Sequence, residues 1–151
     1  MSKIHFNGVK VIGKFVNEFN EILGVHYPVM PICYTKGLEA HIKKQKHYNV
    51  LKYLDRISDI IGTPDYIGIN PHEYGNDTIE IVKKFEEYVM IGIKLDASKE
   101  YYYITTMYTI HSAKIRRRFY SDRLKRVDFS ALKMNGKRNH YFIDEKHIFS
   151  E

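Results

Sequence analysis

Apolar residues recur at helical spacing in the second quarter of the chain. Thr35 is suited to cap a helix that begins near Gly37. By the i, i+3, i+4, i+7 rule, one face of this helix carries Leu38, His41, Ile42 and Gln45. A second helix is predicted over residues 49–61, where the same spacing returns and Gly62 and Pro64 supply a stop. This part of the chain is therefore expected to be helical.

From Tyr66 onward the apolar positions alternate, which indicates strands. The predicted strands cover residues 66–70, 78–85, 88–95 and 101–110. Short connections join the last three, which favours an antiparallel meander. The last strand is rich in β-branched and aromatic residues, and one of its faces is expected to carry Tyr102, Ile104, Thr106 and Tyr108.

The two ends of the chain are less regular. Residues 1–34 contain only short apolar runs, and Pro28 and Pro31 favour an extended stretch before the first predicted helix. Residues 112–126 have the pattern of a strongly basic helix, and residues 127–151 are expected to form a short extension. The order of elements, helices first and then an antiparallel sheet, predicts an α+β fold.

The composition is that of one globular domain. The chain has 151 residues, of which 44% are apolar and 28% charged, so a single domain over residues 1–151 is long enough to bury a core. No apolar run approaches the roughly 20 residues of a membrane span, and the N-terminus lacks a signal-peptide pattern. We therefore expect a cytoplasmic protein with no membrane partner, with delivery into another cell left open. The lone Cys33 excludes a disulfide framework, and we expect it to be a small core residue.

The charge points to a polyanionic partner. Lys and Arg number 24 against 18 Asp and Glu, which gives a net charge of +6, and there are 13 tyrosines. A basic, tyrosine-rich small domain favours nucleic acid as the partner. The alternative at this point is a soluble domain that happens to be basic.

Several familiar catalytic motifs are absent from the sequence. It has no phosphate-binding P-loop, no glycine-rich dinucleotide fingerprint, no His-Glu-x-x-His and no Gly-x-Ser-x-Gly. Its carboxylates do not cluster as a two-metal nuclease requires. We therefore expect chemistry without a metal or a cofactor.

The segment from His41 to His47 is the best candidate for proton transfer. Two imidazoles, which exchange protons near neutral pH, bracket Lys43 and Lys44, which are suited to hold phosphate. At helical spacing the two histidines lie about 120° apart, so they can face one point only if the helix ends near Lys46. The alternative is a core-edge role for His41 and a helix-terminal role for His47.

Two further signals lie on the last strand and the basic helix. Thr106 and Tyr108 could present a hydroxyl and a ring to RNA, or could simply belong to a half-buried strand. Arg116 and Arg117, within the run from Lys114 to Arg118, have the fork geometry that suits phosphate, and Lys83 adds to the same positive field. The alternative is a solvated basic face.

The order and spacing of these motifs resemble a known group of nucleases. The motifs are His41-Ile-Lys-Lys with His47, Pro64–Pro71, Thr78–Lys84, Val89–Asp96, Tyr103–Tyr108 and Lys114–Arg118. Together they are similar to the phage- and mobile-element-associated nucleases of the barnase–EndoU–colicin–RelE-like superfamily. The resemblance covers about residues 10–126, the expected core of the domain, and leaves residues 127–151 as an extension.

The resemblance implies a fold and a site. Members have an N-terminal helical part packed on a four-stranded antiparallel sheet, and they are metal-independent ribonucleases, often toxins or phage effectors. They use a helix histidine with hydroxyl or basic groups on the sheet. By this comparison His41 matches the helix histidine, Thr106 the strand hydroxyl and Tyr108 its neighbour, while His47 and Arg117 match less closely.

The residues and the resemblance together predict a metal-independent endoribonuclease. The 2′-hydroxyl of the substrate would attack the adjacent phosphate and leave a 2′,3′-cyclic phosphate. The expected catalytic residues are His41, His47 and Thr106, and those expected to bind RNA are Lys43, Lys44, Lys83, Tyr108, Arg116 and Arg117. The expected partners are RNA, with tRNA as one candidate, and an acidic inhibitor or immunity protein. The alternatives are a non-catalytic nucleic-acid-binding module and an interaction protein that docks an acidic partner.

Overall fold

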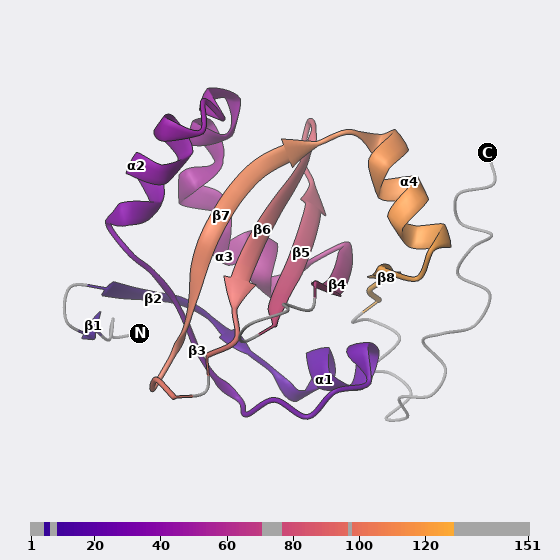
Figure 1. Ribbon diagram of the computed structural model, residues 1–151, viewed down its shortest axis with the longest axis horizontal. Helices are drawn as coiled ribbons and strands as arrows, with labels where there is room; N and C mark the ends of the chain where they lie inside the picture. The colour runs from indigo at the N-terminus through magenta and orange to yellow at the C-terminus, as the bar shows by residue number, and fades with distance from the viewer. Residues whose placement is uncertain (1–4, 7–8, 71–76, 97, 129–151) are drawn as a thin grey trace.

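The structure is a computed structural model that describes residues 5–6, 9–70, 77–96 and 98–128 (Figure 1). Its elements, in chain order, are β1 His5–Phe6, β2 Val9–Phe15, α1 Asn17–Leu23, β3 Met30–Tyr34, α2 Gly37–Lys44, the 3₁₀ helix η1 Tyr48–Arg56, α3 Ile57–Gly62, β4 Tyr66–Asn70, β5 Thr78–Lys84, β6 Tyr88–Lys94, β7 Tyr102–Ile110, α4 Ser112–Tyr120 and β8 Leu124–Arg126. The predicted tail extension falls almost wholly on residues 129–151, outside the described part.

The strands form one mixed sheet in the order β1-β2-β3-β7-β6-β5-β4-β8. All neighbours are antiparallel except β3 and β7, which pair in parallel through Ile32–Tyr102 and Cys33–Tyr103. The expected four-stranded antiparallel sheet with helices leading the chain is therefore wrong, because strands β1 and β2 come first. The meander of β5, β6 and β7 is confirmed by its antiparallel register.

The sheet is larger than predicted because three strands lack clean alternation. β2 carries a register shift between Val11 and Gly13 where it pairs with β3. Pro31 lies inside β3, and a proline within a run weakens a strand pattern. β8 has only three residues and lies within the segment predicted to be a continuous basic helix. Strand pairing with residues far along the chain, rather than local periodicity, creates these three strands.

The three segments predicted to be helical do form helices, but the lengths and helix types differ from the prediction. The segment predicted as one helix over residues 49–61 consists of η1 followed directly by α3. Its inward-facing side chains are buried, and they include Val50, Tyr53, Ile57, Ile60 and Ile61. The basic segment forms α4 and then turns back, so that β8 pairs with β4. Gly68 on β4 permits this pairing, because a Cβ atom there would lie 2.0 Å from the carbonyl oxygen of Arg123.

A β-bulge in β7 changes which side chains share a face. Gly92 on β6 lies opposite Thr106, whereas the next residue, Ile93, lies opposite Ile104, so Thr105 is the extra residue. The predicted common face for Tyr102, Ile104, Thr106 and Tyr108 is therefore wrong. Tyr102 and Ile104 pack in the larger core, and Tyr108 packs at the edge of the second core. The prediction assumed unbroken alternation, and one inserted residue turns every later side chain to the opposite face.

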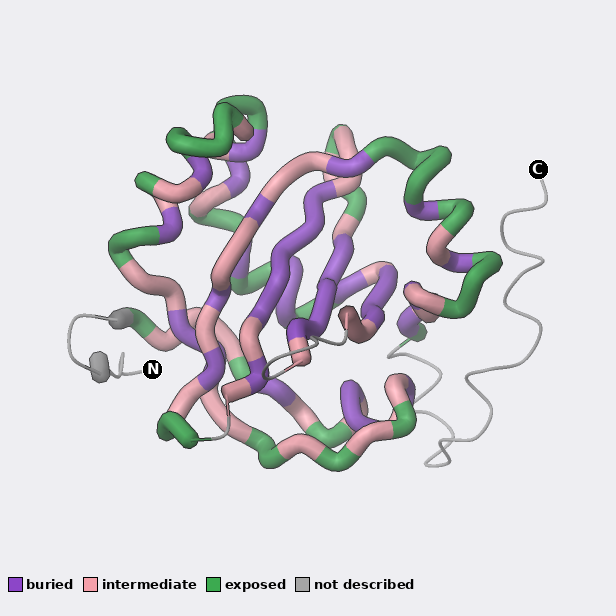
Figure 2. The backbone as a smooth tube through the Cα atoms, in the orientation of Figure 1, coloured by how far each residue is buried: buried purple, intermediate pink, exposed green. Residues whose placement is uncertain are grey.

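The sheet has a hydrophobic core on each face. The larger core contains buried residues from α1, α2, η1 and α3, and Cys33 lies fully buried in β3, as expected. On the other face, Ile115 and Phe119 of α4 pack with Leu124 of β8 against Val82 and other sheet residues. Figure 2 shows the buried central strands between these two layers. No described helix is long and apolar enough to cross a membrane.

Candidate active site

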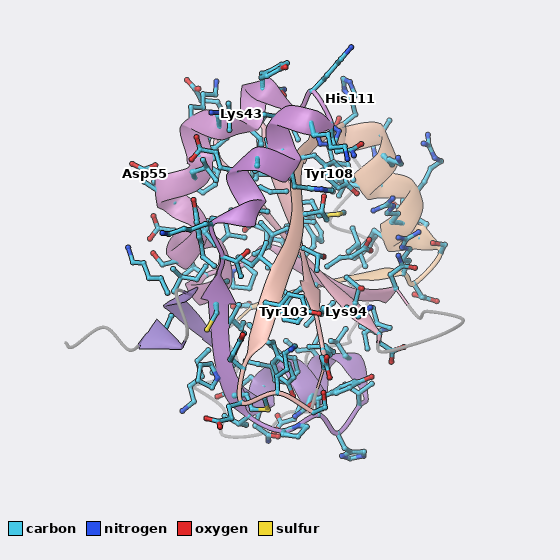
Figure 3. All side chains as sticks on the ribbon, turned by 60° about the vertical axis from the view of Figure 1, so that its left-hand side comes forward. Lys43, Asp55, Lys94, Tyr103, Tyr108 and His111 are labelled. Carbon is cyan, nitrogen blue, oxygen red and sulfur yellow. The ribbon has the colours of Figure 1, made fainter. Side chains whose placement is uncertain are left out.

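A pocket of about 910 Å³ lies where α2 and α4 approach the end of β7. Figure 1 shows the two helices on either side of this strand. The pocket is lined by His41, Gln45, His47, Thr106, Tyr108, Thr109, Ile110, His111, Ala113, Lys114 and Arg117. Of these, Tyr108 and His111 are labelled in Figure 3, at the same end of the molecule. The pocket thus combines five of the nine predicted site residues.

The turn after α2 brings His47 to the same pocket as His41. The amide of His47 donates to the carbonyl oxygen of Ile42 at 3.0 Å, and the amide of Lys46 donates to that of Lys43, also at 3.0 Å. These two bonds are the Schellman pattern that ends many helices. Lys46 takes the left-handed conformation that the pattern requires, with φ of 61°. The helix stops at Lys44, and the sharp turn removes the angular separation that a continuous helix would impose.

The ring of His47 packs against Tyr108. Their ring centroids lie 5.6 Å apart with an angle of 44° between the planes. The Nδ1 atom of His47 is buried and has no hydrogen-bond partner among the described residues. A buried nitrogen without a partner is uncommon in folded proteins and costs free energy unless a ligand or water satisfies it. His47 is therefore held in place by its backbone and by ring packing rather than by a side-chain hydrogen bond.

His41 on α2 and Thr106 on β7 both line the pocket. Both are half-buried, and neither side chain has a hydrogen bond to another described residue. Gln45 lies four residues after His41, at the end of α2, and also lines the pocket. Thr109 is different, because its Oγ1 accepts a hydrogen bond of 2.8 Å from the side chain of Asn49 and so ties η1 to β7. The groups without internal partners are those that a substrate could engage.

The pocket is electropositive. Lys114 and Arg117 lie three residues apart on α4, both exposed, and neither forms an ion pair within the described part of the chain. No Asp or Glu lines the pocket. Two cations with three imidazoles and no carboxylate provide a setting that attracts a phosphate group.

Four of the predicted binding residues lie outside this pocket. Lys43 pairs with Glu39 at 3.0 Å, and Lys44 is exposed without lining the pocket. Lys83 donates a hydrogen bond of 2.9 Å to the carbonyl oxygen of Thr63. The fourth, Arg116, lines a separate groove on α4. The pairing of Lys43 and Lys83 with neighbouring groups gives both of them structural contacts.

Four polar residues of the pocket were not among the predicted site residues: Gln45, Thr109, His111 and Lys114, the last of which had been noted only as part of a basic run. Gln45 was placed on the apolar face of its helix, and Thr109 and His111 were not considered. His111 is exposed and precedes α4. His111 could have been identified by its position in the sequence, because it lies at the junction between the tyrosine-rich strand and the basic helix, both of which carry predicted site residues. No group of three or more His, Cys, Asp or Glu in the described residues could hold a metal ion.

A buried carboxylate fixes α4 and β8 to the sheet. Glu80 on β5 accepts hydrogen bonds of 3.1 and 2.8 Å from Nε and Nη2 of Arg123. The Nη1 atom of Arg118 lies 3.8 Å from the same carboxylate, and the Glu80 side chain is only 7% exposed. The turn at the end of α4 brings the two arginines to the same carboxylate. In this turn Asp122 has φ of 67°, and the amide of Arg123 donates to the carbonyl oxygen of Arg118.

Comparison with known families identifies the protein's class. A family described as phage-Barnase-EndoU-ColicinE5/D-RelE like nuclease3 matches residues 10–117. The chain belongs to this family. The matched residues run from β2 into α4 and include every residue that lines the pocket. Searches of curated proteins and of solved structures returned no significant match. The predicted superfamily is thus confirmed, and the protein is a nuclease of a phage-related family.

Proposed function

We propose that this nuclease is an endoribonuclease that needs no metal. The substrate's 2′-hydroxyl attacks the adjacent phosphate, the bond to the 5′-oxygen breaks, and the products are a 2′,3′-cyclic phosphate and a 5′-hydroxyl. The observation that carries the proposal is the meeting of His41 and His47 with Thr106 and Arg117 in one pocket without carboxylates. Family membership supports the general activity.

The reaction requires three catalytic functions that these side chains can provide. A base takes the proton of the 2′-hydroxyl, an acid protonates the leaving 5′-oxygen, and cations offset the charge that builds on the phosphate. Imidazole serves as base or acid near neutral pH. Because the attacking oxygen belongs to the RNA, no protein nucleophile is needed.

His41 and His47 are the proposed acid–base pair. They come from α2 and from the turn that follows it, so their separation is set by the Schellman turn rather than by a flexible loop. Tyr108 keeps His47 in place through the ring contact. Because Nδ1 of His47 is buried, the proposal assigns proton exchange with the substrate to the other ring nitrogen, Nε2.

Thr106, Lys114 and Arg117 are the proposed phosphate-binding groups. The hydroxyl of Thr106 can donate a hydrogen bond to a non-bridging oxygen, and the two cations on α4 can offset its charge. Lys114 thus replaces Lys44 in the predicted role, since Lys44 does not line the pocket. His111 lines the same pocket and is assigned no part in proton transfer.

Substitution of the histidines tests the proposal. His41→Ala and His47→Ala are each expected to slow cleavage of a defined RNA by about 10²–10⁴-fold, the usual contribution of a general acid or base. His26→Ala is the matched control, because His26 is exposed and lines no pocket wall. Melting temperatures of all three variants should stay close to that of the wild type.

Two results would count against the assignment. If His41→Ala melts much earlier yet cleaves at the normal rate while folded, His41 is a structural residue at the core edge. If wild-type protein binds RNA tightly and never cleaves it, the protein is a nucleic-acid-binding module on a nuclease scaffold.

A further inference from the structure

A second groove, of about 830 Å³, runs along α4 and the turn that follows it. It is lined by Ala113, Arg116, Arg117, Arg118, Tyr120, Ser121 and Arg123. Ala113 and Arg117 also line the candidate active site, so the two hollows adjoin along this helix. A strand of RNA that occupies the pocket can therefore continue into the groove past Arg117.

The groove holds four arginines and no carboxylate at its wall. Arg116 and Arg117 are exposed and have no ion-pair partner among the residues that the structure describes. Their guanidinium groups are thus free to bind a phosphate, for which the planar fork is well matched.

The other two arginines are fixed in position. Glu80 accepts hydrogen bonds from Nε and Nη2 of Arg123, which leaves the Nη1 group of Arg123 unused by that carboxylate. Arg118 lies beside the same carboxylate and is 13% exposed. One buried negative charge therefore orients two positive groups at the base of the groove, and the excess positive charge remains on its surface.

An aromatic side chain completes the groove. Tyr120 is 42% exposed, and its ring contacts Phe119 edge to face, with the centroids 5.5 Å apart. An exposed ring beside arginines is the arrangement that proteins use to stack a base while they hold its phosphate.

We propose that this arginine groove binds a second backbone phosphate of the RNA, on a nucleotide that flanks the cleavage position. The inference rests on the proposed function, because it assumes that the same RNA chain also occupies the active-site pocket. It assigns a separate role to Arg116, Arg118, Tyr120 and Arg123, which hold substrate and take no part in proton transfer. Single-stranded RNA is favoured over an acidic protein, because the ligand must continue from the pocket along the surface of one helix.

Binding of oligonucleotides of increasing length tests this inference without cleavage. Oligonucleotides with 2′-O-methyl groups cannot be cleaved by the proposed mechanism, and their affinity is measured by fluorescence anisotropy. For an oligomer of about eight nucleotides, Arg116→Ala should weaken binding roughly fivefold and make the logarithmic salt dependence less steep by about 0.7, the value for one phosphate contact on a single strand. A dinucleotide, which fills only the pocket, should bind wild type and Arg116→Ala equally.

Two variants define the limits of the effect. Arg117→Ala should weaken binding of both oligomers, because Arg117 lines both hollows. Lys14→Ala is the control, since Lys14 is exposed on β2 and lines neither hollow. Arg116 has no described ion-pair partner whose loss would unfold the protein, and equal melting temperatures would show that the fold is intact.

The outcomes separate this inference from the proposed function. If wild type cleaves RNA but Arg116→Ala binds the long oligomer normally, the groove does not hold RNA and the inference alone fails. If Arg116→Ala weakens binding of the dinucleotide as much as binding of the long oligomer, the inference is also overturned. If wild type neither cleaves nor binds any RNA, the proposed function fails as well.

Discussion

Glu80→Gln is expected to destabilise the protein markedly. The substitution keeps the shape of the side chain and removes its charge. Two arginines then lose their counter-ion: Arg118, whose side chain is 13% exposed, and Arg123, whose side chain is 35% exposed. An uncompensated charge inside a protein is costly, because neither water nor an anion stabilises it.

The magnitude follows from the burial of the three groups. Removing one partner of a buried ion pair typically costs about 3–5 kcal/mol. The cost is lower here, because Arg123 is a third exposed and the Gln carbonyl still accepts one hydrogen bond, so we expect a loss of about 2–3 kcal/mol. For a protein of this size, that loss corresponds to a melting temperature lower by roughly 4–12 °C.

Urea unfolding followed by far-UV circular dichroism measures this loss, since the chain has no tryptophan to report it. Glu39→Gln is the matched control: Glu39 pairs with Lys43 on the surface at 3.0 Å, with side chains 47% and 53% exposed. Such exposed pairs contribute about 0–1 kcal/mol. If Glu80→Gln lies within about 0.5 kcal/mol of wild type, or matches the control, the cluster does not secure α4 and the reasoning is refuted.

Three further predictions concern the turn after α2, the glycine opposite Thr106 and alkaline stability. Lys46→Gly should stabilise the fold by about 1 kcal/mol in urea unfolding, because glycine adopts the left-handed conformation without strain, and cleavage should persist. Gly92→Ala should reduce cleavage, since its Cβ would lie 2.8 Å from Cγ2 of Thr106; an unchanged rate would contradict the placement of Thr106. Burial raises the pKa from 10.0 to about 12 for Tyr27, Tyr66 and Tyr102. The folded state holds these protons to higher pH than the unfolded state, so the free energy of unfolding should fall between pH 10 and 12, by up to about 1.4 kcal/mol per pH unit for each tyrosine, in denaturation at stepped pH.

Local pattern predicted the central elements because their side chains face one core. The alternation of β6 and the helical spacing of α2 each survive in the structure with boundaries shifted by one or two residues. The candidate residues for the site were chosen from the sequence because imidazole, hydroxyl and guanidinium groups stand out in an apolar pattern. Five of them do line one pocket.

The remaining features depend on contacts that no local pattern contains. The parallel pairing of β3 with β7 joins residues far apart in sequence. The bulge at Thr105 inverts the face of half a strand, and it is this inversion that places Thr106 and Tyr108 on the same side of the sheet as α4. The left-handed turns at Lys46 and Asp122 occur without glycine, so the usual signal for a helix end is missing.

The central claim is that the 2′-hydroxyl of RNA is the nucleophile and that no metal takes part. Its most direct test uses an oligonucleotide with one cleaved position, incubated with the protein in EDTA, with that position carrying either ribose or a single 2′-deoxyribose. The account predicts cleavage of the ribose substrate to a 2′,3′-cyclic phosphate, and none at the deoxyribose position. Cleavage of both substrates, or activity that disappears in EDTA and returns with Mg²⁺, would contradict it.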